Sequence, residues 1–107
     1  MSDGEVKELA RNQLDKVANK SAAVVDFYTE WKMPCIMMSP IIDQIAKKYS
    51  EVEFCRVNVE ECNILADKYG VVSAPTVIVF KEGEEIDRIT EALGFEQLEE
   101  RLAELLD

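Results

Sequence analysis

A strand pattern runs directly into a helix pattern in the stretch Val25-Asp26-Phe27-Tyr28-Thr29-Glu30-Trp31-Lys32-Met33-Pro34-Cys35. It begins inside residues 22–28, a short apolar run rich in β-branched side chains that predicts a strand buried on both faces. It ends inside residues 33–49, where apolar residues recur at helical spacing. Pro34 suits the first turn of that helix, because its missing N–H has no helical partner there. One acid, Asp26, interrupts the apolar run.

Strand and helix patterns alternate along the rest of the chain. Three more strands are predicted over residues 52–59, 76–80 and 85–90, and the last two are joined as an antiparallel hairpin with Gly83 in the turn. Three more helices are predicted over residues 11–19, 62–69 and 95–106, the last with Gly94 as its N-cap. Pro40 lies inside the helix of residues 33–49 and predicts a kink. This order predicts an α/β architecture with helices packed on both faces of a sheet.

Length and composition indicate one globular domain over residues 1–107. Apolar residues make up 48% of the chain and charged residues 32%, which is ordinary for a protein with a packed core. No apolar run approaches the roughly 20 residues that span a bilayer, and the acidic N-terminus does not resemble a signal peptide. We therefore expect a cytoplasmic protein that does not enter a membrane.

The charge and the residue inventory exclude several classes of function. A net charge of −10 disfavours nucleic acid as a partner, because phosphate binding needs clustered Lys and Arg. The absence of histidine removes His-based zinc sites and Cys-His or Ser-His catalysis. Three widely spaced cysteines, an odd number, leave at least one free thiol. We expect no cofactor and no metal. Met33, Met37 and Met38 could supply soft ligands for Cu(I), but methionines at helical spacing more often belong to a core or a groove surface.

The stretch from Val25 to Cys35 resembles the thioredoxin family, whose signature Trp-Cys-Gly-Pro-Cys ends a strand and opens a helix. Four further features match: Asp26 at the buried-acid position, Pro40 at the helix kink, Asn58 in the third strand, and Ala74-Pro75-Thr76 at the cis-proline loop. The resemblance covers essentially the whole chain. It implies the thioredoxin fold, a central mixed β-sheet of four to five strands flanked by helices on both faces. Local propensity favours a helical turn for residues 6–9, whereas the resemblance implies a short first strand, which we adopt.

The resemblance also implies roles for individual residues. In thioredoxins the first cysteine of the signature attacks a disulfide, and the second resolves the mixed disulfide that forms. Cys35 stands at the resolving position, and Asp26 at the position of the acid that accepts its proton. Arg56 stands where the family often has a lysine, so the resemblance implies a basic partner for the buried Asp26. Trp31, Pro34, Ala74 and Pro75 would border a groove that receives an extended segment of a protein substrate.

Two positions depart from the family pattern. Lys32 replaces the attacking cysteine, and an ammonium group cannot form a mixed disulfide. The remaining thiol, Cys35, stands where access is limited, so it is a poor first attacker. Glu91 occupies a position beside the groove where the family usually has glycine, and its carboxylate would narrow or charge that groove.

Two function classes follow. The first is a thiol–disulfide oxidoreductase family member whose dithiol exchange is impaired, with at most monothiol redox chemistry through Cys35. The second is a redox-inactive module that binds protein partners through the groove around Trp31 and Pro75. An engineered lysine at position 32 of an otherwise ordinary thioredoxin is a third alternative. We expect a monomer, with a disulfide-linked dimer through Cys62 or Cys35 as the alternative.

Overall fold

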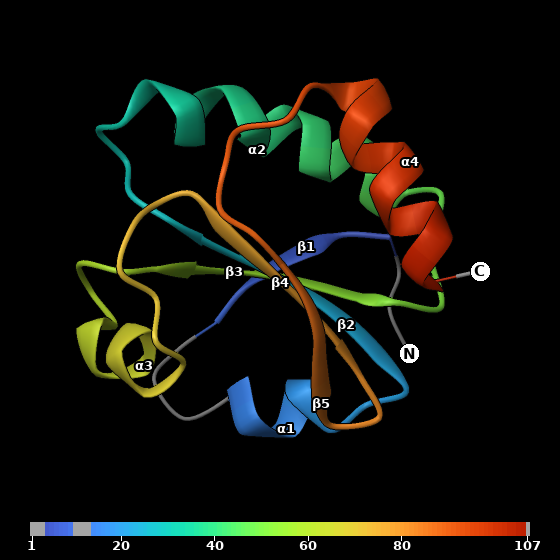
Figure 1. Ribbon diagram of the computed structural model, residues 1–107, viewed down its shortest axis with the longest axis horizontal. Helices are drawn as coiled ribbons and strands as arrows, with labels where there is room; N and C mark the ends of the chain where they lie inside the picture. The colour runs from blue at the N-terminus through green and yellow to red at the C-terminus, as the bar shows by residue number, and fades with distance from the viewer. Residues whose placement is uncertain (1–3, 10–13, 107) are drawn as a thin grey trace.

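The computed structural model describes residues 4–9 and 14–106 of the chain. Strands and helices alternate along these residues (Figure 1). In chain order they are β1 (Val6–Glu8), α1 (Leu14–Ala18), β2 (Ala22–Tyr28), α2 (Met33–Ala46), β3 (Glu53–Asn58), α3 (Asn63–Lys68), β4 (Thr76–Lys81), β5 (Glu84–Ile89) and α4 (Phe95–Leu106).

The strands form one mixed sheet in the order β1-β3-β2-β4-β5. β1 and β2 each pair with β3 in parallel, and β4 pairs antiparallel with β2 and β5. In the centre of the sheet, Val25 of β2 lies opposite Cys55 of β3 on one side and Ile78 of β4 on the other. This central position explains why residues 22–28 read as an apolar run, since side chains on both faces of β2 are buried.

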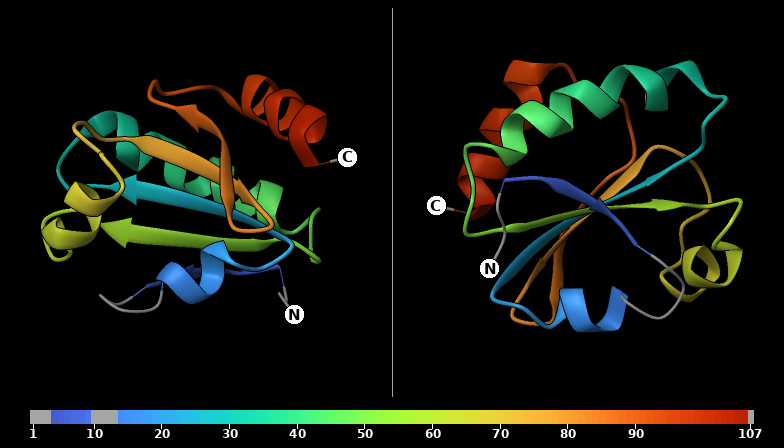
Figure 2. Two further views of the ribbon diagram at one scale, coloured as in Figure 1. Left: turned by 60° about the horizontal axis from the view of Figure 1, so that its bottom comes forward. Right: turned by 180° about the vertical axis from the view of Figure 1, so that it is seen from behind.

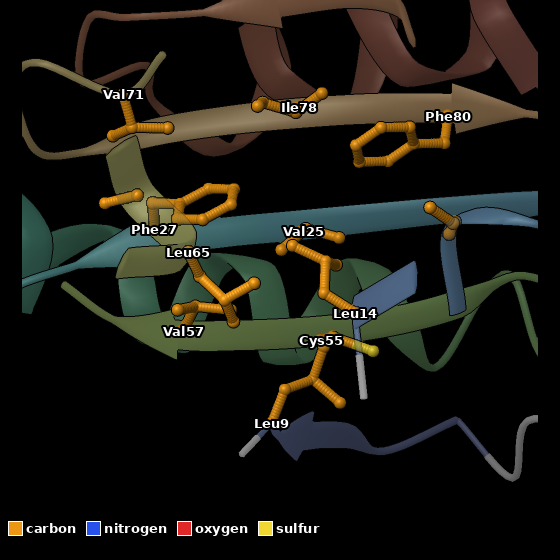
Figure 3. Close-up of a cluster of buried hydrophobic side chains, with 13 residues drawn as sticks. Leu9, Leu14, Val25, Phe27, Cys55, Val57, Leu65, Val71, Ile78 and Phe80 are labelled. Atoms are coloured by element: carbon orange, nitrogen blue, oxygen red, sulfur yellow. The ribbon is translucent and has the colours of Figure 1, made fainter. Parts of the chain in front are cut away.

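Helices cover both faces of the sheet. α2 and α4 lie over one face, and α1 and α3 lie over the other (Figures 1 and 2). Val25 and Phe27 point into the core beneath α1 and α3, together with Leu14 and Leu65 (Figure 3). Val24 belongs to the opposite core, beneath α2 and α4. Because successive strand side chains alternate between faces, Asp26 lies on the α2 side, as Val24 does.

The mixed five-stranded sheet with helices on both faces confirms the predicted fold class, and the hairpin is also as predicted. The two residues between β4 and β5 are Glu82 and Gly83, with φ of 53° and 86°. Positive φ at both positions is the geometry of a two-residue turn whose twist matches that of the strands. Gly94 begins α4: its carbonyl accepts a hydrogen bond from the Leu98 N–H at 3.0 Å, and its own N–H donates to Gln97 Oε1 at 3.3 Å.

Some element boundaries differ from the sequence-based prediction. Residues 6–8 form a strand, as the resemblance implied, and local propensity was wrong because Val6 pairs with Phe54 of β3. α2 ends at Ala46 rather than Tyr49, and the Tyr49 N–H donates back to the Ala46 carbonyl at 3.2 Å in a tight turn. The predicted helix start at residues 11–13 lies outside the described residues. Pro40 is inside α2 as expected, and the kink stays a prediction.

Candidate functional site

The connection from β2 to α2, the helix α3 and the segment before β4 gather at one end of the sheet (Figure 1). This is the end where β2 and β3, two parallel strands, reach their carboxyl termini. Crevices at this end of parallel strands are where α/β proteins commonly bind ligands. The motif of residues 25–35 includes the β2–α2 connection and therefore reaches the same end of the sheet.

Lys32 occupies the N-cap position of α2. Its backbone is extended, and its carbonyl accepts hydrogen bonds from the N–H groups of Cys35 and Ile36, both at 3.1 Å. Its side chain forms no capping hydrogen bond, and the first turn of α2 contains no acidic residue. Pro34 lies in that first turn, as the sequence indicated. The positive end of the helix dipole is therefore not offset by an acid of its own helix.

The ammonium group of Lys32 lies over the indole ring of Trp31. Nζ is 5.4 Å from the ring centroid, within the range of a cation–π contact. Trp31 is 66% exposed, whereas Lys32 is half-buried. In the part of the chain that the structure describes, no carboxylate oxygen lies within 4.0 Å of this ammonium group. A positive charge that has no ionic partner among the described residues thus stands where the family signature has its attacking thiol.

A cavity of about 260 Å³ opens beside Trp31, and we call it the Trp31 cavity. Its walls come from the β2–α2 connection, α3 with the connection that precedes it, and the segment before β4. They are formed by Thr29, Trp31, Lys32, Val59, Asn63, Ala66, Asp67, Val71, Val72, Ser73 and Ala74. Val72 on its rim is 96% exposed.

Of the residues expected to border a groove, Trp31 and Ala74 line the Trp31 cavity, and Lys32, at the position of the missing nucleophile, lines it with them. Pro75 is buried where β4 begins, and the Ala74–Pro75 peptide bond is cis. Pro34 is exposed on α2, and Glu91 is exposed two residues after β5 ends. Neither Pro34, Pro75 nor Glu91 lines the Trp31 cavity, so a role for them in binding a partner stays a prediction.

Cys35 is 3% exposed in the first turn of α2 and is a free thiol. It contributes to the wall of a second cavity of about 340 Å³, together with Ile36, Ser39 and Pro40. Cys35 and Trp31 therefore line two different cavities. A buried thiol attacks a disulfide poorly, because few reagents reach it.

The other sulfur-containing side chains do not add a second reactive thiol to the site. Cys55 is buried in β3, and burial, assisted by Glu53, raises its pKa to about 12. Cys62 is half-buried at the N-cap of α3 and is a free thiol. Met38 packs in the core beneath α2, whereas Met33 and Met37 are exposed. Among the described residues, no group of three or more His, Cys, Asp or Glu side chains is arranged to hold a metal ion.

Asp26 is 2% exposed on the α2 side of the sheet. Within the described residues, its Oδ1 has no hydrogen-bond partner. Burial raises the pKa of Asp26 to about 7, although the positive charge of Arg56 acts in the opposite direction. Arg56 lies opposite Asp26 in register, yet its guanidinium donates to Asp43 Oδ1 at 3.3 Å and to the Ser39 carbonyl at 3.5 Å. The basic residue expected to pair with Asp26 is thus engaged with α2.

Several wall residues were not singled out by sequence. Asn63, Ala66 and Asp67 are spaced i, i+3, i+4 on α3, so they share one face of the helix, and that face lines the Trp31 cavity. The spacing is a usable signal once the helix is known. Thr29 was also missed: it is 5% exposed, and its Oγ1 has no hydrogen-bond partner among the described residues.

In sequence, the chain is similar to known thioredoxins. The thioredoxin family model matches residues 5–104 of the chain. The chain belongs to the thioredoxin family. A thioredoxin of Staphylococcus epidermidis is 35% identical over 103 residues, which cover 95% of each protein. The chloroplastic M-type thioredoxin of Triticum aestivum is 38% identical over 78 residues; these are 72% of this chain but only 45% of the wheat protein, so the match spans less than half of that relative.

The solved structures agree with the family assignment. A mutant thioredoxin from Halobacterium salinarum superposes with a TM-score of 0.90 at 25% identity, covering 100% of this chain and 96% of that one. The thioredoxin fold expected from the stretch of residues 25–35 is confirmed. Among the described residues, no helix combines the length and the apolar character needed to cross a bilayer.

Proposed function

We propose that this single domain, residues 1–107, binds protein segments at the Trp31 cavity and does not carry out dithiol exchange by itself. The observation that carries the proposal is the ammonium group of Lys32 at the cavity wall, in the place of the attacking thiol. A dithiol cycle needs one thiol to attack and a second to resolve the mixed disulfide. The motif here has only Cys35, which is buried.

Monothiol redox chemistry through Cys35 is the second candidate. It is favoured by the second cavity, in which Cys35 forms part of the wall. In this reaction the Cys35 thiolate attacks a partner disulfide, forms a mixed disulfide and releases the other sulfur of the partner as a thiolate. No second motif cysteine is present to break that mixed disulfide, so an external thiol such as glutathione would have to release the partner.

We further propose a cytoplasmic monomer. The odd number and wide spacing of Cys35, Cys55 and Cys62 favour free thiols over a disulfide framework, which suits a reducing compartment. Of the two cysteines considered for a disulfide-linked dimer, Cys62 is the more accessible, because it is half-buried whereas Cys35 is buried. The net charge of −10 favours protein partners over nucleic acid.

The proposal is tested by insulin reduction in the presence of dithiothreitol. We expect the chain to add nothing to the rate given by dithiothreitol alone, and Lys32→Cys to accelerate the reaction because it restores an attacking thiol. Lys47→Cys is the matched control, since it adds a thiol to the other end of α2. If Glu91 also narrows the groove, Lys32→Cys combined with Glu91→Gly should be faster still. Equally fast reduction by the native chain and Lys32→Cys would refute the proposal.

A further inference from the structure

We propose that the Trp31 cavity recognises an extended protein segment that carries one acidic side chain between apolar ones, with Lys32 as the residue that determines this specificity. The inference rests on the proposed binding function and adds the chemistry of the partner. It follows from the charge of Lys32, the surroundings of that charge, and the size and character of the cavity walls.

The charge of Lys32 is available to a partner. Other cations of the fold are paired within it: Arg88 contacts Glu85 at 2.8 Å, Arg101 contacts Asp87 at 2.7 Å, and Lys48 contacts Glu99. Lys32 has no such carboxylate among the described residues, and its Nζ is held 5.4 Å from the Trp31 ring centroid at the cavity wall. A half-buried cation is screened less by salt than an exposed one, so a carboxylate that reaches it is stabilised.

The helix dipole of α2 acts in the same direction, and one carboxylate of the cavity lining opposes it. The N-terminus of α2 places the positive end of a 14-residue helix beside Lys32, with no acid in its first turn. Thr29 belongs to the same wall, but its hydroxyl oxygen, which has no hydrogen-bond partner among the described residues, is itself buried and does not add to the positive charge at this wall. One carboxylate, Asp67 on α3, is part of the lining, but none of the ion pairs among the described residues joins it to the Lys32 ammonium. The cavity therefore has a basic side and an acidic side.

The remaining walls favour a peptide over a small cofactor. Trp31, Val71, Val72 and Ala74 supply apolar surface, of which Val72 is 96% exposed. The volume of about 260 Å³ is smaller than that of typical small-molecule sites, roughly 300–1,000 Å³, and suits one or two side chains. The net charge of −10 repels a strongly acidic protein at long range, so the segment carries one carboxylate in a neutral, apolar context.

The test uses two capped peptides, acetyl-Gly-Val-Asp-Val-Gly-amide and its counterpart with Asn in place of Asp. The capping groups leave the Asp side chain as the only carboxylate. Binding is followed by fluorescence of Trp31, the single tryptophan of the chain, which lines the cavity. We expect the Asp peptide to bind about fivefold more tightly than the Asn peptide, the ratio given by an ion pair of about 1 kcal/mol. Added salt should reduce this ratio.

Two variants distinguish the effect of the Lys32 charge at the cavity from the effect of the net charge of the chain. Lys32→Gln should bring the two peptides to the same affinity, whereas Lys47→Gln, which removes the same charge about 20 Å away along α2, should keep the preference. Far-ultraviolet circular dichroism checks that both variants are folded. Equal binding of both peptides to the native chain would overturn the inference and leave the proposed binding function intact. No change in Trp31 fluorescence with either peptide up to millimolar concentration would overturn both.

Discussion

The carboxyl group of Asp26 is buried on the α2 side of the central strand, and its Oδ1 has no hydrogen-bond partner among the described residues. The pKa of Asp26 is raised to about 7. Burial is the largest cause, the positive charge of Arg56 acts against it, and the negative charges of Glu8 and Asp43 add to the rise. Ionising such a group costs free energy in the folded state that it does not cost in the unfolded chain. In thioredoxins this acid takes part in proton transfer, but here no attacking cysteine precedes Cys35.

We predict that Asp26→Asn stabilises the protein, most at alkaline pH. The folded pKa of about 7 lies above the unfolded value of about 4, so the penalty is absent below pH 4, grows as the pH rises to 7, and is complete above it. Urea unfolding should therefore give a free energy of unfolding about 1–3 kcal/mol higher for Asp26→Asn at about pH 8.5, and a smaller difference at about pH 4. Equal destabilisation at both pH values would mean that Asp26 is a satisfied structural partner.

At the residue scale, the sequence predicted burial better than it predicted pairing. Asp26 and Cys35 were expected to be buried, because each lies at a family position flanked by apolar residues, and both are. The expected contact of Asp26 with Arg56 does not form as an ion pair among the described residues, since Arg56 is directed to Asp43 on α2. Whether Arg56 pairs with Asp26 or with Asp43 depends on how α2 packs over the strands. A local sequence pattern does not reveal that packing.

At the scale of elements, Arg88 on β5 holds the end of α3 in place. Its guanidinium donates to the Tyr69 carbonyl at 2.6 Å and to the Gly70 carbonyl at 3.0 Å, and it also forms two hydrogen bonds to Glu85, both at 2.8 Å. Carbonyls at the C-terminus of a helix have no helical partner, and a cation there also interacts favourably with the helix dipole. The segment that follows, beginning at Val71, forms one wall of the Trp31 cavity.

We therefore predict that Arg88→Ala loosens the wall of the Trp31 cavity. Removing the guanidinium removes its hydrogen bonds to the Tyr69 and Gly70 carbonyls and to Glu85, so the free energy of unfolding should fall by about 1–3 kcal/mol. Hydrogen exchange of the Val71 amide, which donates to the Ala66 carbonyl at 2.8 Å, should become faster. Arg101→Ala is the matched control, because it removes two hydrogen bonds to Asp87 that anchor α4 instead. Equal acceleration at Val71 in both variants would contradict a specific role for Arg88.

Element types were predictable where a pattern was long, and less so at the edges. The central strand β2 follows from a continuous apolar run, and α4 follows from apolar residues at helical spacing. β1 has three residues, too few for periodicity to act as a signal, and it is a strand because β3 offers an unpaired edge. The Trp31 cavity is formed by three separate segments, so sequence indicated its residues on the β2–α2 connection but not those of α3.

At the scale of the whole molecule, acidic residues outnumber basic ones 22 to 12. Ion pairs link neighbouring elements, such as Arg101 of α4 with Asp87 of β5, and that contact lowers the pKa of Asp87. Among the described residues, the ion pairs involve a minority of the carboxylates: Glu53, Glu99, Asp43, Glu85 and Asp87. The excess negative charge repels itself more in the compact state than in the expanded chain. Repulsion among the excess carboxylates therefore lowers the free energy of unfolding, and salt can screen this repulsion.

We predict that sodium chloride stabilises the chain. Screening weakens the repulsion among excess carboxylates over the whole surface, whereas exposed ion pairs, which it also weakens, are worth little individually. The urea midpoint of unfolding should rise between low salt and about 0.5 M sodium chloride, where the Debye length falls to a few ångströms. Urea is used because guanidinium chloride is itself a salt. A midpoint that falls with salt would show that ion pairs outweigh net repulsion.

The central claim concerns the whole site: neither Lys32 nor Cys35 attacks a disulfide of a partner. Dipyridyl disulfide, which is uncharged and releases a coloured thione when a thiol attacks it, measures this directly. The native chain should release one equivalent from Cys62, which is half-buried, and the Cys62→Ser variant should release almost none until it is unfolded. Lys32→Cys in the Cys62→Ser background should react at once, which shows that the reagent reaches the site. Rapid release of one equivalent by folded Cys62→Ser would identify Cys35 as a working thiol and contradict the account.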